Sequence, residues 1–352
     1  MPNTADQPID FFARRIHYVD HLAPVWGALG ERRGMFFVPE GILDHAQKLG
    51  IKATTLKPID PAMPLNVAPK SGNPLVVCAY GDLAQAYNVR PQRTFIFLEH
   101  GVGITPSGHA GYAGGTGLRR KVALFLAPNE YIRAKTAQAL PGAHQVVVGT
   151  PKLDEFAPAL SPAYRFVMGK TKPVICISFH WNGEKISPEA GNAFKHYQDV
   201  VGLLAQGPWK DEFTLIGHGH PREIERLAVF YESVGIEVER NFRNVMRIAD
   251  VYVNDCSSTA YEFCVTGKPV ILLNAPWFRR DVNWGIRFWD YSNIGRQVDE
   301  PEQLFTAILQ AINNPDHYVL NRYDMVQELY PFLGYSAQRA AGAILGFCGG
   351  KK

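Results

Sequence analysis

The chain has 352 residues and a formal net charge of +3; 46% of its residues are hydrophobic and 20% are charged. This balance excludes disordered, fibrous and coiled-coil chains, and the small charge does not by itself indicate nucleic acid or an anionic membrane as a partner. Because single cores seldom exceed roughly 250–300 residues, the length predicts two domains. No apolar run approaches the roughly 20 residues that span a bilayer, so we expect no membrane-spanning helix.

The cysteine pattern and the first residues both favour a cytoplasmic protein. Residues 1–8 lack the basic and then apolar order of a secretion signal. The five cysteines, at positions 78, 176, 256, 264 and 348, show no C-x-x-C spacing, which predicts buried thiols rather than a disulfide framework or a zinc knuckle. Residues 11–26 mix aromatic and arginine side chains; we expect a packed helix there, with peripheral membrane contact as the alternative.

Short apolar runs alternate with helix-like stretches along the chain, which is typical of parallel sheets. A first series predicts strands over 75–79, 94–98, 123–127 and 145–148. A second series predicts strands over 174–178, 213–217, 251–254 and 270–273, separated by helices over 189–204, 222–234 and 258–266. Three prolines in 151–162 predict a linker. We therefore predict an α/β protein with domains over 1–160 and 161–323 and a terminal segment over 324–352.

Polar residues follow four of the predicted strands, at 99–101, 180–182, 218–221 and 254–258. Open α/β sheets bind ligands at the carboxyl ends of their strands, so we expect a site in a cleft where the two sets of strand ends face each other. His180 and His218 are candidate site residues for this reason. The glycine-rich segment 108–117 follows the first of these strand ends, and it predicts either a lid over the cleft or a connection without function.

The segment 255–263 indicates an anion site. It begins with Asp255, and the hydroxyls of Ser257, Ser258 and Thr259 stand where a strand gives way to a short helix. Backbone N–H groups and hydroxyls at such a place favour phosphate or pyrophosphate, whereas simple helix capping needs one hydroxyl only. Glu262 lies one helical turn after Ser258, where it would accept hydrogen bonds from a ribose or remain a solvated surface carboxylate.

Histidines at two other strand ends suggest general-base and phosphate-binding roles. His100 precedes the flexible Gly101, and its imidazole suits a base that deprotonates a hydroxyl; a core or capping histidine is the alternative. His220 and Arg222 fit a cationic clamp for phosphate, although the His-Gly-His spacing with His218 also begins some zinc sites. The chain has no D-x-D and no P-loop motif, so charge neutralisation is expected from protein groups, without a metal or other cofactor.

Taken in order, these motifs resemble the CDP-glycerol glycerophosphotransferases, the family of the wall teichoic acid primases and polymerases. The resemblance covers about residues 95–275 and rests on His100-Gly101, His220-Pro221, Asp255-Cys256-Ser257-Ser258, Tyr261-Glu262-Phe263 and Gly267-Lys268-Pro269. Cys256 and Lys152 stand where that family has tyrosine and arginine, and residues 1–70 show no match. The resemblance implies a GT-B fold, with an acceptor-side first domain, a donor-binding second domain and a C-terminal helix over 324–345 that crosses back.

The resemblance also implies a reaction in which an acceptor hydroxyl attacks the glycerol-side phosphorus of CDP-glycerol and CMP leaves. His100 would be the base, His220 with Arg222 would hold the diphosphate, and Ser257 and Ser258 would bind its oxygens. A GT-B glycosyltransferase that uses a nucleotide-sugar on a sugar, lipid or modified-base acceptor is the alternative, and a sugar-nucleotide epimerase and a nucleotide-binding module without catalysis are further ones. A polymer or a lipid-linked molecule would be the acceptor.

Overall fold

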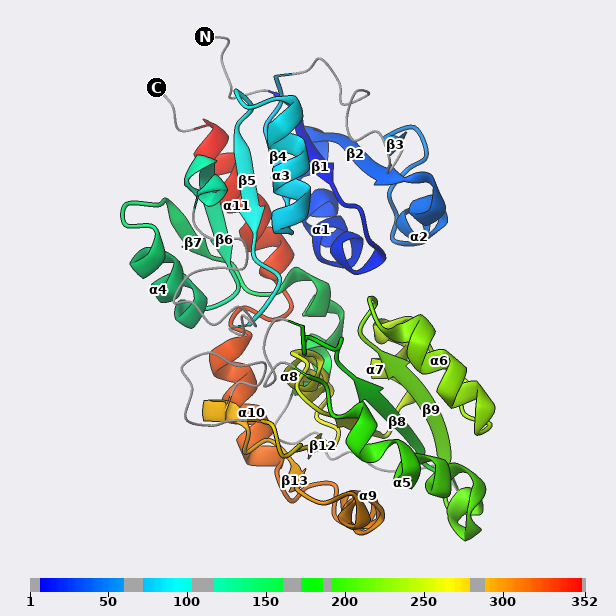
Figure 1. Cartoon of the computed structure of the whole chain (residues 1–352). Coiled ribbons are helices and arrows are strands. Elements are labelled where there is room, and N and C mark those ends of the chain that lie inside the picture. The colour runs from blue at the N-terminus through cyan, green and yellow to red at the C-terminus, as the bar shows by residue number, and fades with distance from the viewer. Residues whose placement is uncertain are drawn as a thin grey trace. The chain divides into compact units, whose positions relative to one another are not determined.

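The computed structural model describes residues 7–59, 72–102, 117–160, 172–185, 191–278 and 289–349. These residues form two compact units, shown in Figure 1. Unit 1 contains the described residues up to Ala157 and those from Glu328 onward, and unit 2 contains the described residues from Pro158 to Gln327. Each unit is built on its own parallel sheet with its own core, so the two are described separately.

The sheet of unit 1 has seven parallel strands in the order β3-β2-β1-β4-β5-β6-β7. Its strands are buried on both faces, because Phe11 belongs to the core on one face and the adjacent Phe12 to the core on the other. The strands are β1 (Ile9–Phe12), β2 (Arg33–Pro39), β3 (Leu56–Ile59), β4 (Leu75–Val77), β5 (Phe95–Leu98), β6 (Val122–Ala127) and β7 (Gln145–Val147).

The sheet of unit 2 has six parallel strands in the order β10-β9-β8-β11-β12-β13. Chain order reverses between β8 and β11, and this reversal is where open α/β sheets place their ligands. The strands are β8 (Val174–Phe179), β9 (Thr214–Gly219), β10 (Glu237–Val238), β11 (Val251–Asn254), β12 (Val270–Leu273) and β13 (Arg296–Val298).

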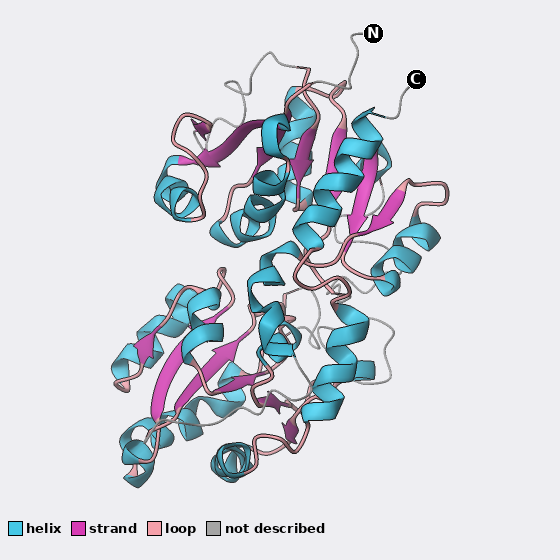
Figure 2. Ribbon diagram, turned by 180° about the vertical axis from the view of Figure 1, so that it is seen from behind, coloured by secondary structure: helices cyan, strands magenta, loops and turns pink. Residues whose placement is uncertain are grey.

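Helices flank the strands within each unit (Figure 2). In unit 1 the N-terminal helix α1 packs against the C-terminal helix α11, and α11 also contacts β6. The helices of unit 1 are α1 (Ile16–Ala28), α2 (Leu43–Lys48), α3 (Tyr80–Val89), α4 (Glu130–Ala139) and α11 (Ser336–Gly349). Unit 2 has α5 (Phe194–Gln206), α6 (Ile224–Ser233), α7 (Phe242–Ile248), α8 (Thr259–Phe263) and α9 (Leu304–Asn313), and α10 (Val319–Leu329) follows.

The predicted fold class is confirmed: the chain forms two Rossmann-like parallel-sheet units with alternating helices. All eight predicted strands are present, with ends shifted by one or two residues. The sequence pattern missed β1, β2 and β3 in unit 1 and the short β10 and β13 in unit 2. The five cysteines are free and buried, as predicted. Among the described residues, no helix is long and apolar enough to cross a membrane.

The structure refines three local predictions. The packed helix expected over 11–26 is present as α1, whereas Phe11 and Phe12 lie in the fully buried β1; these aromatics and Trp26, which is 3% exposed, are core residues and do not face a membrane. The segment Pro151–Leu160, expected to be a linker, is a 3-10 helix, and the boundary between the two units falls within it, after Ala157. The helix expected over 324–345 is interrupted after Leu329, because Pro331 has no N–H and Gly334 adopts a left-handed φ of 97°.

Asp154 fixes the C-terminal chain within unit 1. Its carboxylate accepts backbone hydrogen bonds from Gly334 at 3.0 Å, Ser336 at 3.1 Å and Ala337 at 2.8 Å, across 180 or more residues of sequence. Two of these donors lie in the first turn of α11, where N–H groups have no partner within the helix. A carboxylate in that position both satisfies them and complements the helix dipole.

Candidate functional site

The loops after β8 and β11 are held together by one buried carboxylate. Asp255 is 1% exposed and accepts backbone hydrogen bonds from His180 at 3.0 Å, Ala193 at 2.9 Å and Cys256 at 2.7 Å. It thereby ties the end of β8 and the segment before α5 to its own loop, at the reversal point of the sheet. Asp255 thus fixes the loops at the carboxyl edge of the unit-2 sheet. Its contact with a nucleotide-activated donor stays a prediction.

The three hydroxyls after β11 behave differently from one another. Ser257 accepts hydrogen bonds from the backbone N–H of Thr259 at 3.3 Å and from the Thr259 hydroxyl at 2.9 Å. Thr259 in turn lies 2.8 Å from the hydroxyl of Tyr252 on β11. Ser258 is the N-cap residue of α8, yet its side chain makes no capping hydrogen bond. Helix capping therefore does not account for the Ser258 side chain, and of the three hydroxyls it is the best candidate for a hydrogen bond to a ligand.

Glu262 is not a solvated surface carboxylate, because it is only 3% exposed. It lies on α8 among residues that are all buried, next to Tyr261 and Phe263. Burying an ionised carboxylate is costly unless polar partners compensate. The alternative of a surface glutamate is wrong, and the ribose contact stays a prediction.

Four side chains from the ends of β8 and β9 form one cluster, which we call the His180–Arg222 cluster: His180, Trp181, His220 and Arg222. The rings of His180 and His220 have centroids 5.0 Å apart, and the Trp181 ring lies 5.6 Å from His180 and 6.4 Å from His220. The exposed Arg222 guanidinium lies 5.4 Å from the Trp181 ring centre. Two imidazoles, an indole and a cation therefore share the carboxyl edge of the unit-2 sheet.

His220 and His180 differ in the hydrogen bonding of their ring nitrogens. The backbone N–H of Arg222 donates to Nδ1 of His220 at 3.1 Å, so a neutral His220 carries its proton on Nε2, which is a donor. Burial lowers the pKa of His180 from 6.5, and the Asp255 carboxylate partly opposes this effect. His180 is thus a neutral ring at pH 7, and its Nδ1 atom is buried without a hydrogen-bond partner among the described residues.

His218 lies apart from this cluster and is part of the core. It is 5% exposed, its Nδ1 lies 2.7 Å from the carbonyl oxygen of Glu239, and its ring is 5.6 Å from Phe242. Burial lowers its pKa below 6.5. No group of three histidine, cysteine or carboxylate side chains that could hold a metal ion occurs in the described part of the chain. His218 therefore does not combine with His220 into a ligand set.

Lys268, from the Gly267-Lys268-Pro269 motif, has a structural role. Its ammonium donates to three carbonyl oxygens at the end of α7, those of Met246 at 3.0 Å, Arg247 at 3.1 Å and Ala249 at 2.7 Å. The residue is 9% exposed, so the cation satisfies buried acceptors at the negative end of a helix. The motif marks a helix cap, which explains why lysine precedes β12.

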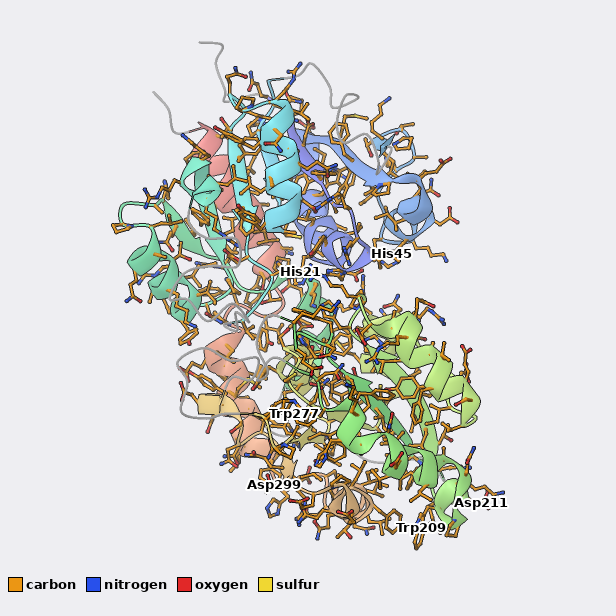
Figure 3. The ribbon with its side chains drawn as sticks, in the orientation of Figure 1. His21, His45, Trp209, Asp211, Trp277 and Asp299 are labelled. Carbon is orange, nitrogen blue, oxygen red and sulfur yellow. The ribbon has the colours of Figure 1, made fainter. Side chains whose placement is uncertain are left out.

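In unit 1, His100 at the end of β5 lies among other rings. Its ring centroid is 5.7 Å from His21 and 5.3 Å from Tyr18, both on α1, where Figure 3 labels His21. The pKa of His100 is lowered from 6.5 to about 4, mainly by burial; a hydrogen bond with the Cys78 backbone opposes this effect, and the cations Lys152 and Arg119 add to it. His100 is therefore neutral at pH 7, the form that accepts a proton.

Glu99, the preceding residue, shows the opposite shift. Burial raises its pKa from 4.5 to about 7, and the Arg119 guanidinium opposes this rise. Arg119 is 5% exposed and stacks between Tyr80 and Phe97, at 5.1 and 5.5 Å from their ring centres. The Oε1 atom of Glu99 is buried without a hydrogen-bond partner among the described residues. One strand end thus carries a neutral imidazole and a carboxyl group that titrates near neutrality.

His21 is a residue that the sequence pattern did not select. His21 is 2% exposed, and burial, followed by Lys152 and His100, lowers its pKa well below 6.5. No local sequence pattern indicates the contact between His21 and His100, because the two residues lie far apart in the sequence. Gly101 directly follows His100 as expected, but most of the glycine-rich segment 108–117 lies outside the described residues, so its role as a lid is not addressed.

No protein-family model matches this chain, and no curated protein matches it. Solved structures do. The S. aureus MnaA–UDP co-structure is similar with a TM-score of 0.63 and 15% identity, covering 96% of this chain and 96% of that chain. A putative UDP-N-acetylglucosamine 2-epimerase from Listeria monocytogenes has a TM-score of 0.66 and 13% identity, covering 99% and 98%.

The wall teichoic acid polymerase TagF, in a variant structure soaked with CDPG, is also similar, with a TM-score of 0.66 and 11% identity over 99% of this chain and 90% of that chain. At identities of 11–15% these likenesses show a shared fold. The chain thus has the two-domain architecture of nucleotide-sugar epimerases and of a teichoic acid polymerase.

Proposed function

We propose that this chain is a transferase that binds a nucleotide-activated donor through unit 2 and activates an acceptor hydroxyl through His100 of unit 1, with CDP-glycerol as donor. The observation that carries the proposal is the His180–Arg222 cluster at the carboxyl edge of the unit-2 sheet. It offers an imidazole N–H from His220 and a guanidinium from Arg222 at the place where such sheets bind phosphates.

The His180–Arg222 cluster suits a diphosphate for electrostatic reasons. The Nδ1 atom of His220 is engaged by the Arg222 backbone, so its Nε2–H is committed to donation. Hydrogen bonds from such a donor and from a guanidinium to phosphate oxygens are charge-assisted and stronger than neutral ones. Ser258, whose hydroxyl makes no capping bond, adds a further donor on the neighbouring loop. Ser257 and Thr259 hold that loop through their own hydrogen bonds.

The proposed reaction transfers glycerol phosphate. His100 takes the proton from the acceptor hydroxyl, and the oxygen attacks the phosphorus that carries glycerol. A new P–O bond forms while the bond to the CMP phosphate breaks, and CMP leaves with the electron pair. Burial and two cations keep the pKa of His100 low at about 4, and a negatively charged donor would raise it toward the range of an effective base. His220 and Arg222 would stabilise charge on the leaving phosphate.

A nucleotide-sugar is the second candidate donor. The solved structures that resemble this chain include complexes with UDP and UDP-GlcNAc, and the same cluster would hold any nucleoside diphosphate. A glycosyltransferase would use His100 on a sugar or lipid hydroxyl, whereas an epimerase would need no acceptor. The buried Glu262 is then a candidate partner for the donor ribose.

The test is calorimetric titration of the chain with CDP-glycerol, CMP, UDP-GlcNAc and UDP, followed by product analysis. Two variants distinguish the roles of the two ring nitrogens of His220. Glutamine places an amide donor near the position of Nε2, whereas asparagine reaches only the position of Nδ1. We expect His220→Asn to weaken CDP-glycerol binding about ten- to a hundredfold and His220→Gln to weaken it less, since a hydrogen bond to a charged group contributes about 1.5–3 kcal/mol. His144→Gln, at an exposed histidine in unit 1, is the matched control.

Selective cytidine binding that is lost in His220→Asn supports the glycerophosphate donor. Preference for UDP-GlcNAc, with sugar transfer or epimerisation in the product analysis, assigns the second candidate. If none of the four nucleotides binds, or if His220→Asn and His144→Gln bind alike, the proposed donor site is wrong. Ser258→Ala tests the neighbouring loop, and we expect it to weaken binding by a smaller factor than His220→Asn.

A further inference from the structure

Unit 2 contains a second concave site at the opposite edge of its sheet. A cavity of about 530 Å³ lies where β12 and β13 begin, and α9, the start of α10 and the turn between them complete it. The His180–Arg222 cluster lies at the carboxyl ends of parallel strands, whereas this cavity lies at amino ends. The volume is within the roughly 300–1,000 Å³ of small-molecule sites. Figure 1 shows β12, β13, α9 and α10 in the same part of unit 2.

The wall of this cavity is cationic and apolar. Among the described residues, its lining contains Arg296, His317 and Arg322 and no aspartate or glutamate. Val270 and Leu309 belong to its apolar part, which also includes prolines and an alanine. Such a wall fits a ligand with an anionic head and an apolar body, and it disfavours a cation.

Arg322 is the residue that makes this cavity unusual. It is 2% exposed, and its guanidinium donates to the carbonyl oxygens of Gly267 at 3.1 Å, Pro315 at 2.8 Å and Ile294 at 3.5 Å. These acceptors are neutral dipoles, and Arg322 forms no ion pair with a carboxylate of the described residues. In the part of the chain that the structure describes, its buried Nε atom has no hydrogen-bond partner.

A buried cation that lacks an anionic partner is costly, because carbonyl dipoles compensate only part of its lost hydration. Burial lowers the pKa of Arg322, and Cys264 and the Asp316 carboxylate, neither of which forms an ion pair with it, oppose only part of this effect. An anion beside the guanidinium would recover part of this cost, and the apolar wall would add the free energy of burying alkyl carbon. A ligand gains both contributions only because the cavity places the Arg322 charge next to an apolar surface.

We propose that this cavity binds a small amphiphilic anion, a short alkyl chain with a carboxylate or phosphate monoester head, as a second ligand of unit 2. The head compensates Arg322 and the exposed Arg296, and the chain lies on the apolar side that includes Val270 and Leu309. This site is independent of the donor site proposed above, since the two involve different residues at opposite edges of the sheet.

The experiment titrates the whole chain with octanoate, octyl phosphate, hexanoate and octanol, followed by NMR saturation transfer and calorimetry. We expect binding of at least one of the two eight-carbon anions, about tenfold weaker binding of hexanoate than of octanoate because two methylene groups are lost, and about tenfold weaker binding of octanol because the charge is lost. The two head groups distinguish a fatty acid from a phosphorylated alcohol as the source of the anion.

Substitutions in the wall of the cavity test whether the ligand binds there. Gln310 lines it and is exposed, so Gln310→Glu adds a carboxylate to its wall at little risk to folding. Gln206→Glu makes the same change at the exposed end of α5, away from the cavity. We expect Gln310→Glu to weaken anion binding about tenfold and Gln206→Glu to leave it unchanged. Arg296→Gln should weaken binding about threefold, as expected for an exposed charge.

Three results would overturn the proposal: no binding of either eight-carbon anion, octanol binding as tightly as octanoate, or equal binding to the two glutamate variants. Nucleotide titration of Gln310→Glu should match the unmodified chain. A failure of the donor site and a failure of this cavity are therefore distinguished by which ligand is lost.

Discussion

The adjacent residues Glu99 and His100 should make the stability of unit 1 depend on pH in opposite directions. The folded pKa of Glu99 is about 7 against an ordinary 4.5, so its stabilising contribution is present below pH 4.5 and is lost as the pH rises to 7. The folded pKa of His100 is about 4 against 6.5, so its contribution is present above pH 6.5 and is lost as the pH falls to 4.

Each of these shifts corresponds to about 3 kcal/mol, taking ~1.36 kcal/mol for each tenfold change in proton affinity. In the unmodified chain, the pH dependences that Glu99 and His100 give to the free energy of unfolding largely cancel between pH 4.5 and 6.5. Glu99→Gln removes the carboxyl and leaves the imidazole. The free energy of unfolding of the variant, relative to the unmodified chain, should therefore increase by about 3 kcal/mol from pH 4.5 to pH 7.5.

Urea unfolding at five pH values between 4.5 and 7.5 measures this difference. Hydrogen exchange in peptides that cover β5 reports on unit 1 separately from unit 2. Glu130→Gln, at an exposed glutamate of α4 in the same unit, is the matched control variant. Parallel curves for Glu99→Gln and the unmodified chain would refute the reasoning, because they would show that Glu99 titrates as it does in the unfolded chain.

Three further outcomes follow from contacts already described. Lys268→Met leaves three carbonyls at the end of α7 without their donor and should destabilise unit 2 by about 3 kcal/mol in urea unfolding, whereas the exposed Lys210→Met should change it by less than about 0.5 kcal/mol. Asp255→Ala removes the acceptor of three backbone N–H groups and should lower the free energy of unfolding by about 3–5 kcal/mol, with Asp211→Ala, at an exposed aspartate, as control. A decrease below about 1 kcal/mol would contradict the role of Asp255 in fixing these loops. If His100 is the base of the proposed transfer, the acid limb of kcat/KM for the donor, which reports the enzyme before the donor binds, should fall near pH 4, and a limb at pH 6.5 would show that burial does not control this imidazole.

The strand predictions succeeded where both faces of a strand are buried. Such strands read as continuous apolar runs, as in Phe95–Leu98 and Val270–Leu273. The pattern failed for Ile9–Phe12, because an aspartate at position 10 interrupts the run and its carboxylate is instead buried in contact with Arg93. It also failed for the short Glu237–Val238 and Arg296–Val298, which contain too few residues to show a period.

At the candidate site, the sequence alone determined which residues follow the strands. Since the carboxyl ends of parallel strands share one edge, that information was enough to select His100, His220, Arg222 and the segment 255–258. It could not assign tasks to them. Asp255 and Ser257 have carboxylate and hydroxyl groups suited to a ligand, yet both accept backbone hydrogen bonds that fix the loops.

Tertiary structure alone decided the properties that depend on burial and on distant neighbours. The pKa of His100 is set by loss of hydration and by Lys152 and Arg119, and its ring neighbour His21 comes from a helix almost eighty residues earlier in the chain. The three carbonyl groups that accept hydrogen bonds from Arg322 likewise come together only when three segments fold around it. Apolar periodicity is local and is therefore readable from sequence, whereas electrostatics acts through space and depends on which segments the fold brings together.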